Sequence, residues 1–474
     1  MSSVAKAVET LRLVTSQEPI KGLSEAFAHA GYELALVGGP VRDAFLGRPV
    51  HDLDFTTSAR PDDIERIVKP LAQATWDVGR EFGTIAAQLG DYTVEITTYR
   101  ADTYDGSSRK PDVVFGDTLE ADLVRRDFSM NAMALTLPDV KLIDPCQGLD
   151  DLLAGVLRTP SAPEESFNDD PLRMMRGARF VSQLGVTVHE DTARAMRDMA
   201  PRIADISAER VREELTRLLS TDSPRPGLEI LVETGIADVV LPELPALQLE
   251  TDEHAHHKDV YQHTLTVVEQ AIDEEKRRFP GQPADVVLRL AALLHDIGKP
   301  ATRRFEAGGA VTFYHHDVVG AKLAKKRLKA LRFDNNTIDS VSQLIELHLR
   351  FFGYADQAWS DSAVRRYVRD AGPELQRLHM LVRADVTTRN KRKADRLSFA
   401  YDDLEARIAT LAEQEELQAI RPDLDGEDIM RILGLKPGRE VGEAYRFLLD
   451  LRLDEGELGA EVATKRLQEW WANR

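Results

Sequence analysis

The sequence is short of several features, and each shortage excludes a class of protein. Cysteine occurs once, at Cys146, so the chain can form neither an internal disulfide nor a zinc site built from several cysteines. No apolar run approaches the length that spans a bilayer, and the first residues lack the apolar core of a secretory signal. Basic residues are outnumbered by acidic ones, 61 to 80, so the net charge is −19. We therefore expect a cytoplasmic protein without a membrane segment and without a generally basic surface.

Length and composition describe an ordinary folded protein. A chain of 474 residues is too long for one typical core, so about two to four domains are expected. Hydrophobic residues make up 43% and charged residues 30%, which is typical of soluble proteins. No feature of the sequence predicts a protein partner.

The most informative stretch begins at the apolar run Leu34–Val37, which predicts a buried strand. Gly38 and Gly39 break this strand, and the apolar spacing after them predicts a short amphipathic helix. A glycine turn that leads into a helix leaves backbone N–H groups pointing outward, where they favour phosphate. Arg42, in the same helix, can add a guanidinium to a triphosphate. Gly38, Gly39 and Arg42 are therefore candidate nucleotide-binding residues.

Two carboxylates follow on the next predicted strand. Asp52 and Asp54 are two residues apart, so their side chains point to one face of the strand and can share a metal ion. Glu95 lies on a later predicted strand, where it can complete a site for two divalent ions. Each of these acids alone would fit a solvated strand face equally well. Together, after a phosphate-binding turn, they favour a metal site.

This combination resembles the nucleotidyltransferase superfamily that includes DNA polymerase β. The form Gly-Gly-x-Val-Arg-Asp at 38–43 is similar to class II CCA-adding enzymes and bacterial poly(A) polymerases. The resemblance implies nucleotidyl transfer, with Mg²⁺ held by Asp52 and Asp54 and with Glu95 as a third catalytic carboxylate.

A second motif, Arg125-Arg126-Asp127-Phe128, resembles the Arg-Arg-Asp-Phe signature of the same family. The resemblance implies that Asp127 contacts the ribose and that Arg126 lies near the nucleotide or the primer. A carboxylate that accepts from a 2′-hydroxyl is a reasonable way to prefer ribonucleotides.

A third motif begins at Asp169 and is similar to the class II pattern Glu-Asp-x-x-Arg, which reads the incoming base. Asp170 and Arg173 match this pattern, and a helix would place them on one face, whereas Asp169 departs from the family's glutamate. Cytosine and adenine each present an amino donor beside a ring-nitrogen acceptor, so an aspartate and an arginine together suit both bases. Uracil and guanine have the opposite polarity and would leave buried groups unpaired.

A separate constellation of histidines and aspartates follows in the second half of the chain. His263, the pair His295-Asp296 and Asp385 occur in an order that resembles the HD phosphohydrolase superfamily. The resemblance implies a helical core that binds one or two divalent ions, and imidazole with carboxylate suits transition metals. His316 and His348 are further ligand candidates.

Basic residues gather locally despite the acidic total. One stripe at helical spacing predicts an RNA-binding surface, although a solvated helix face has the same pattern. It consists of Lys322, Lys325, Lys326 and Lys329, with Arg327 and Arg332 beside it.

We therefore expect an α+β fold: a polymerase-β-like nucleotidyltransferase head with a small mixed β-sheet, then an all-α neck, an HD-type helical domain and a helical C-terminal region. The predicted domains are residues 1–160, 161–245, 246–390 and 391–474. We also expect residues 161–168 to form a linker and Ser207 to be the N-cap of a helix in the neck. The expected reaction is template-independent addition of C, C and A to the 3′ end of tRNA from CTP and ATP, with a phosphohydrolase activity in the HD domain as a further possibility. The alternatives are a poly(A) polymerase, an enzyme that adds only CC or only A, an HD phosphohydrolase whose head only binds RNA, and a non-catalytic RNA-binding protein.

Overall fold

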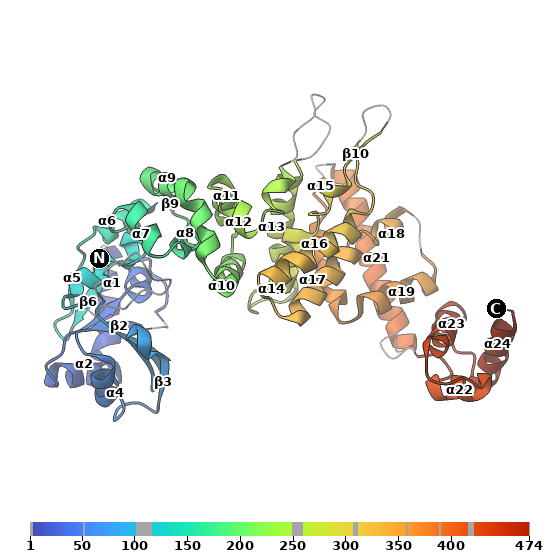
Figure 1. The fold of residues 1–474 in the computed structure, drawn as a ribbon, viewed down its shortest axis with the longest axis horizontal. Helices are drawn as coiled ribbons and strands as arrows, with labels where there is room; N and C mark the ends of the chain where they lie inside the picture. Colours follow the sequence, from blue (N-terminus) through green and yellow to red (C-terminus); the bar gives the residue numbers. More distant parts are fainter. Residues whose placement is uncertain are drawn as a thin grey trace. The chain divides into compact units, whose positions relative to one another are not determined.

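The computed structural model describes residues 3–50, 53–100, 116–248, 259–306, 311–356, 359–387, 390–415 and 421–473. The chain divides into two compact units, Met1–Val240 and Leu241–Arg474. The first unit holds a seven-stranded sheet followed by helices, and the second is almost wholly helical (Figure 1). The predicted α+β fold, with a head domain followed by helical domains, is confirmed.

The sheet of the first unit has the strand order β3-β4-β5-β2-β1-β6-β7. Strands β2 and β5 pair in parallel and the other neighbours pair antiparallel, so the sheet is mixed as predicted. The strands are β1 (Leu34–Val37), β2 (Leu53–Thr57), β3 (Ala74–Gly79), β4 (Thr84–Leu89), β5 (Tyr92–Thr98), β6 (Ala134–Leu137) and β7 (Lys141–Ile143).

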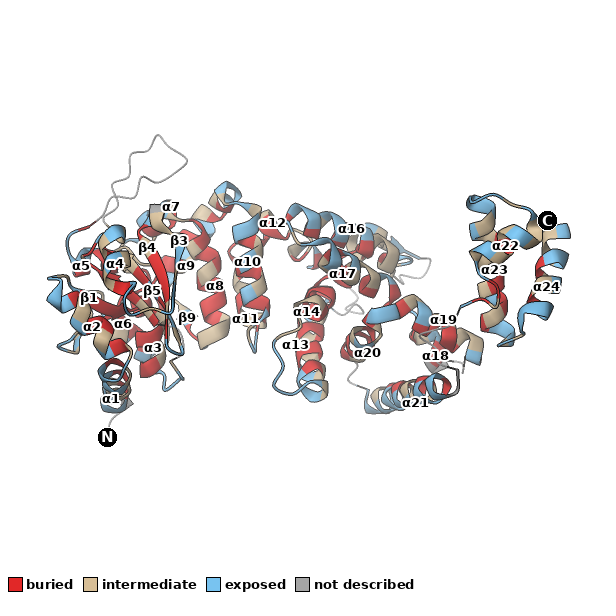
Figure 2. Ribbon diagram, turned by 90° about the horizontal axis from the view of Figure 1, so that it is seen from below, coloured by how far each residue is buried: buried red, intermediate tan, exposed pale blue. Residues whose placement is uncertain are grey.

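Strand β1 is central and buried on both faces, which explains its continuous apolar sequence. Leu34 and Leu36 project into the larger core, whereas Ala35 and Val37 project into a smaller one on the opposite face. Helices α1 (Ser3–Ser16), α2 (Ile20–His29), α3 (Gly39–Phe45) and α4 (Pro61–Val68) contribute to the larger core, and α5 (Leu119–Val124) to the smaller. Buried residues line the strands and the inner helix faces in Figure 2.

The helices after the sheet begin earlier than the sequence predicts. We expected residues 161–168 to form a linker, but most of them belong to helix α7 (Pro163–Asp169), in which Pro163 occupies the first turn. The next helix, α8, begins at Leu172, so Asp170 lies between two helices and shares no helix face with Arg173. The remaining helices of this unit are α6 (Gly148–Ala154), α9 (Glu190–Met199), α10 (Ala208–Leu219), α11 (Arg225–Glu233) and α12 (Ile236–Val240).

Helices α8 (Leu172–Leu184) and α11 pack very closely, and one glycine makes this possible. A Cβ atom on Gly227 would lie 2.4 Å from the carbonyl oxygen of Ala178 and 2.5 Å from Leu218 Cδ1. Only glycine fits such an approach without moving a backbone. Ser207 caps the third helix of this group, α10, by accepting from the backbone N–H of Arg210, as predicted.

The second unit is almost wholly helical, and the ends of five of its helices converge on one centre. Its elements are α13 (Val260–Arg278), α14 (Val286–Leu294), α15 (Lys299–Thr302), β10 (Arg304–Phe305), β11 (Val311–Thr312), α16 (His316–Ala330), α17 (Asn335–Leu347), α18 (Phe352–Asp356), α19 (Asp361–Ala371), α20 (Leu375–Ala384), α21 (Lys391–Glu415), α22 (Gly426–Leu433), α23 (Arg439–Glu455) and α24 (Ala460–Ala472). The last three helices share a small core of their own, in which Phe447 stacks on Trp470 at a centroid distance of 4.7 Å.

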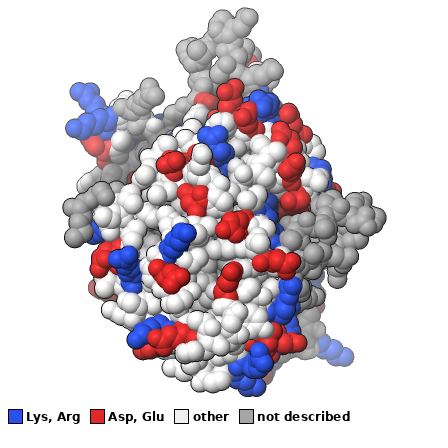
Figure 3. All heavy atoms as spheres, turned by 90° about the vertical axis from the view of Figure 1, so that its left-hand side faces the viewer, with Lys and Arg blue, Asp and Glu red and all other residues white. Residues whose placement is uncertain are grey.

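The surface charge and the hydropathy of the helices agree with the composition of the sequence. Acidic and basic side chains are interspersed on the face that Figure 3 shows. Among the described residues, no helix is both long and apolar enough to cross a bilayer.

Candidate functional site

A cavity of about 370 Å³ in the first unit brings together residues from all three head and neck motifs. Five arginines and three aspartates border it, so its walls are polar and on balance positive. Such a lining suits a ligand with several negative charges. The lining residues are Gly38, Gly39, Arg42, Asp54, Arg126, Asp127, Asn131, Asp170, Arg173, Arg176, Arg179 and Phe180.

The glycine turn lies against the second motif. Gly38 has φ = +72°, a conformation that favours glycine, and a Cβ atom there would lie 3.4 Å from Arg126 Nη1. Arg126 donates to the buried carboxylate of Asp122 at 3.1 Å, which holds its guanidinium beside the turn. The backbone of the turn and a cation therefore face the same space.

Arg42 also borders the cavity, but its guanidinium is already engaged. Its Nε donates to Asp43 Oδ1 at 2.9 Å and its Nη1 donates to Asn131 Oδ1 at 2.7 Å. The side chain is 5% exposed and lies over the ring of Phe180, with 5.3 Å between Cζ and the ring centroid. In this structure Arg42 thus ties helix α3 to the loop that carries the second motif.

The predicted metal-binding carboxylates lie on two neighbouring strands. Asp54 of β2 pairs with Glu95 of β5 in parallel register, so the two side chains project to the same face of the sheet. Asp54 borders the cavity and Glu95 is exposed. Asp52 lies outside the described residues. The sheet therefore brings at least two of the three predicted carboxylates together.

Asp127 is the most heavily hydrogen-bonded acid of the cavity. Its Oδ1 accepts from the Phe128 backbone N–H at 2.8 Å and from Asn131 Nδ2 at 3.0 Å, and its Oδ2 accepts from Arg176 Nε at 2.8 Å. Burial by itself would raise the pKa of this carboxyl, but the charge of Arg176 and these hydrogen bonds lower it to about 2. Asp127 is therefore a fixed negative charge that orients Arg176 and Asn131.

The predicted base-reading pair lies at the junction of α7 and α8. Asp170 accepts from the Leu172 backbone N–H at 3.1 Å and from Arg210 Nη2 of α10 at 2.8 Å. Arg173 donates to Ser166 Oγ at 2.9 Å and to the carbonyl oxygen of Arg125 at 2.7 Å. Both side chains border the cavity, and their mutual position is set by three helices and not by helical spacing.

Four lining residues were missing from our sequence prediction: Asn131, Arg176, Arg179 and Phe180. Arg173, Arg176 and Phe180 recur along α8 at a spacing of three and four residues, which is a helical face that the sequence could have revealed. Arg179 is held by Glu214 of α10 at 2.9 Å and lies 4.3 Å from the Phe180 ring centroid. Asn131 carried no comparable signal, because its role depends on contacts with Arg42 and Asp127.

The second unit contains a separate cluster of four histidines and two aspartates. The predicted His263, His295, Asp296 and Asp385 meet there, and so do the further candidates His316 and His348. Two sets of three have ligand atoms within 4.8 Å of one another: His263, His295 and Asp385, and Asp296, His316 and His348. They lie at the ends of five helices: near the start of α13 and of α16, and just after the last residues of α14, α17 and α20.

The histidines of this cluster are oriented with one nitrogen outward and the other toward the centre. Nδ1 of His295 and Nδ1 of His316 each lie 2.8 Å from a backbone carbonyl oxygen, of Ala292 and Phe313 respectively. Their Nε2 atoms are buried and lack a well-formed hydrogen bond within the described part of the chain. Such orientation of imidazole by an outer partner is typical of metal ligands. The residues therefore fit a divalent metal centre.

Charge within the cluster shifts the pKa values in opposite directions. Burial would lower the pKa of His295, but the adjoining Asp296 and Asp385 raise it to about 10. Burial, and then the charge of His295, lower the pKa of His348 to about 4. Lys299, which sequence reasoning missed, donates to Asp296 Oδ2 at 2.6 Å and places a further cation at the edge of the cluster.

The predicted lysine stripe is confirmed only as an exposed face of helix α16. All four lysines are exposed, but Lys325 donates to Asp339 at 3.0 Å. Arg327, which we placed beside the stripe, is bound by Glu243 at 2.9 Å.

Fold and cavity together define a nucleotidyltransferase with a separate HD domain. Three family models match the chain: Poly A polymerase head domain at residues 34–158, Probable RNA and SrmB- binding site of polymerase A at residues 185–247, and HD domain at residues 260–413. Nucleotidyltransferases and HD proteins use divalent metals, and the described chain has residue groups suited to hold them.

The A-adding tRNA nucleotidyltransferase of Deinococcus radiodurans is 34% identical over 451 residues, which are 92% of this chain and 95% of that protein. The chain therefore belongs to the tRNA nucleotidyltransferase and poly(A) polymerase family, and it also carries an HD domain. The CCA-adding enzyme of Streptococcus gordonii is 43% identical over 46% of this chain and 54% of that protein, so this match spans about half of either. The crystal structure of Bacillus stearothermophilus CCA-adding enzyme in complex with CTP is similar at a TM-score of 0.63 and 26% identity, covering 97% of this chain and 99% of that one.

Proposed function

We propose that this enzyme adds C, C and A to the 3′ end of tRNA from CTP and ATP without a nucleic-acid template. The observation that carries this proposal is the cavity, in which Asp170 and Arg173 border a space that is also lined by four further arginines and by Asp54. Asp170 offers acceptors and Arg173 offers donors, a pattern that matches cytosine and adenine but not uracil or guanine. A relative that adds A to tRNA and another that adds CCA support the choice of substrate.

The carboxylates of the sheet would hold Mg²⁺. Asp54 and Glu95 lie side by side with oxygen ligands, which this ion prefers, and Asp52 would complete the set. When bound there, two Mg²⁺ ions would acidify the RNA 3′-hydroxyl and neutralise the departing pyrophosphate. Asp54 and its neighbours would thus position the reacting ends of primer and nucleotide.

The arginines of the cavity would bind the triphosphate. Arg126 and the Gly38–Gly39 turn face the same space, so the backbone N–H groups and the guanidinium can share the phosphate oxygens. The ribose contact of Asp127 stays a prediction, because its carboxylate already accepts hydrogen bonds from three residues. We expect it to act mainly by holding Arg176 toward the nucleotide.

One assay separates complete from partial addition. Two tRNAs, one that lacks the whole CCA end and one that ends in CC, are each incubated with CTP, with ATP and with both, and the products are resolved at single-nucleotide length. Complete CCA addition requires both nucleotides and stops after the terminal A. A chain that extends only tRNA ending in CC, and only with ATP, would be an A-adding enzyme like its relative from D. radiodurans. A long A tail would identify a poly(A) polymerase.

A second activity, metal-dependent hydrolysis of phosphoesters, is favoured by the histidine–aspartate cluster. Its six side chains fit one or two transition-metal ions such as Mn²⁺, Co²⁺ or Zn²⁺. The bound metal would polarise a phosphoryl oxygen and generate a hydroxide. Replacing His295 and Asp296 by alanine should abolish metal binding and hydrolysis but leave nucleotide addition intact. If the wild-type chain binds no divalent metal in this domain, the proposed phosphohydrolase activity is wrong.

We also infer that the stripe Lys322, Lys325, Lys326 and Lys329 contacts tRNA phosphates. Changing Lys322, Lys326 or Lys329 singly to Gln should weaken tRNA binding and reduce its salt dependence. Lys325→Gln removes the same charge but should weaken binding less, because Asp339 already pairs with that lysine. Equal effects in all four single variants would assign the loss to net charge alone.

A further inference from the structure

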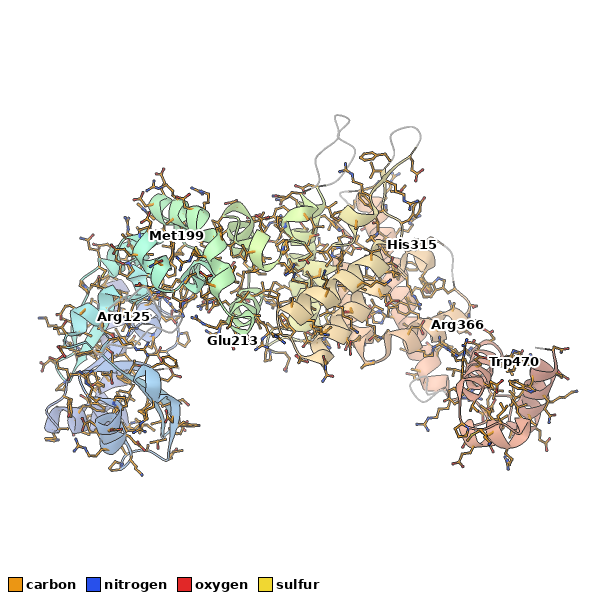
Figure 4. The ribbon with its side chains drawn as sticks, viewed as in Figure 1. Arg125, Met199, Glu213, His315, Arg366 and Trp470 are labelled. Atoms are coloured by element: carbon orange, nitrogen blue, oxygen red, sulfur yellow. The ribbon has the colours of Figure 1, made fainter. Side chains whose placement is uncertain are left out.

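A short hairpin beside the histidine–aspartate cluster exposes two aromatic rings. Strand β10 pairs antiparallel with β11, and α16 begins at His316, shortly after β11. The hairpin lies next to α15 in Figure 1, and Figure 4 labels His315 at its end. Phe305 is 63% exposed and Tyr314 is 64% exposed.

One side of the hairpin combines the rings of Phe305 and Phe313 with cations. The pairing of Phe305 with Val311 places both on one face, and residues 303 and 313 follow on the same face by strand alternation. The guanidinium of Arg303 lies 4.8 Å from the Phe305 ring centroid, and Lys299 Nζ lies 5.7 Å from that of Phe313. We call Arg303, Phe305, Val311 and Phe313 the hairpin surface.

The hairpin surface is joined to the metal-binding cluster at both ends. At its start, Lys299 donates to Asp296 Oδ2 at 2.6 Å. At its end, the carbonyl oxygen of Phe313 lies 2.8 Å from Nδ1 of His316. Lys299 thus lies between the Phe313 ring of the hairpin surface and the Asp296 carboxylate of the cluster.

We propose that the hairpin surface binds a nucleobase, and that it presents the phosphate of that nucleotide to the histidine–aspartate cluster. An aromatic ring with a guanidinium over one face is a stacking site for bases, because every base has a π-face. Lys299 and Arg303 offer positive charge for the phosphate, in a chain whose net charge is −19. The proposal rests on the phosphohydrolase activity proposed above and narrows its substrate to the nucleotide at an RNA end or a free nucleotide.

The test uses the full chain and a short single-stranded RNA that carries 2-aminopurine at its last position and a 3′-phosphate. Stacking on the hairpin surface quenches 2-aminopurine fluorescence, so titration gives both the affinity and the stacked state. Phe305→Ala should weaken binding about tenfold, as expected for the loss of one stacking ring. Phe305→Trp should restore it. The matched control is Phe399→Ala on helix α21, whose ring is 74% exposed.

Two results would overturn the proposal. One is unchanged affinity and quenching in Phe305→Ala, and the other is an equal loss in Phe399→Ala. The same titration with 2-aminopurine riboside 3′-monophosphate distinguishes a free nucleotide from an RNA end as the ligand. If Phe305→Ala loses affinity equally for the nucleotide and for the strand, the ligand is a free nucleotide. If it loses affinity for the strand alone, the ligand is an RNA end. Because Phe305 is largely exposed, its replacement should leave the melting temperature and nucleotide addition unchanged.

A third measurement separates this proposal from the phosphohydrolase activity itself. Ring-free phosphoesters such as glycerol phosphate cannot stack, so their hydrolysis should be the same in the wild type and in Phe305→Ala. If the wild type hydrolyses no phosphoester at all, the proposed phosphohydrolase activity is wrong. The fluorescence titration still tests whether the hairpin surface binds a nucleobase.

Discussion

Replacing Arg173 by alanine is the sharpest test of base selection by the protein. In the structure this arginine donates to Ser166 Oγ at 2.9 Å and to the Arg125 carbonyl oxygen at 2.7 Å. These two contacts fix the guanidinium at the edge of the cavity, where it would donate to N3 of cytosine or N1 of adenine. The variant removes that donor, while Asp54 and the phosphate-binding turn stay in place.

The expected size of the effect follows from the hydrogen bond that is lost. A charged hydrogen bond contributes about 1.5–3 kcal/mol, which corresponds to roughly ten- to a hundredfold in the ratio of kcat/KM values for correct and incorrect nucleotides. Ser166→Ala retains the guanidinium and removes one anchor, so its loss of selectivity should be smaller, about two- to tenfold. Asp169→Ala should also do less, because its position already departs from the family's glutamate.

The assay measures incorporation of UTP and GTP against CTP and ATP at saturating tRNA. Selectivity should fall in the order wild type, Ser166→Ala, Arg173→Ala. A variant that loses activity equally for all four nucleotides would refute the reasoning, because Arg173 would then hold the helix junction or the triphosphate. A melting temperature near that of the wild type is the control for folding.

Three further predictions concern the metal site and two buried titratable side chains. Asp54→Ala, like Asp52→Ala, should abolish nucleotide addition but leave tRNA affinity largely intact, and activity within a few-fold of the wild type would place the metals elsewhere. Asp127→Asn should lower the free energy of unfolding by about 2 kcal/mol at pH 7, since the folded pKa of about 2 lies below the usual value, and the deficit in urea melts should shrink as the pH falls from about 4 toward 2. Burial lowers the pKa of His379 to about 4, so protonation of this residue favours the unfolded state. The free energy of unfolding should therefore fall as the pH is lowered from about 6.5 to about 4. His379→Leu should flatten this dependence in urea melts at several pH values.

Much of this protein can be predicted from local sequence because the signals act over short distances. The apolar run at Leu34–Val37, the break at Gly38 and the alternation around Asp54 predict strand, turn and strand, and the sheet contains all three. The order of the motifs predicts a head with a mixed sheet and helical domains after it. Hydrophobic periodicity and capping residues such as Ser207 depend only on neighbours along the chain.

Only the tertiary structure decided which side chains share a site. Asp170 and Arg173 meet at a junction of helices because α7 replaces the expected linker, and Arg210 reaches Asp170 from a helix that lies forty residues on. The six side chains of the histidine–aspartate cluster come from five separate helices or helix ends, so no spacing along the chain could determine that they converge. Packing of helices in three dimensions sets these distances, whereas sequence periodicity specifies only which face of each helix is buried.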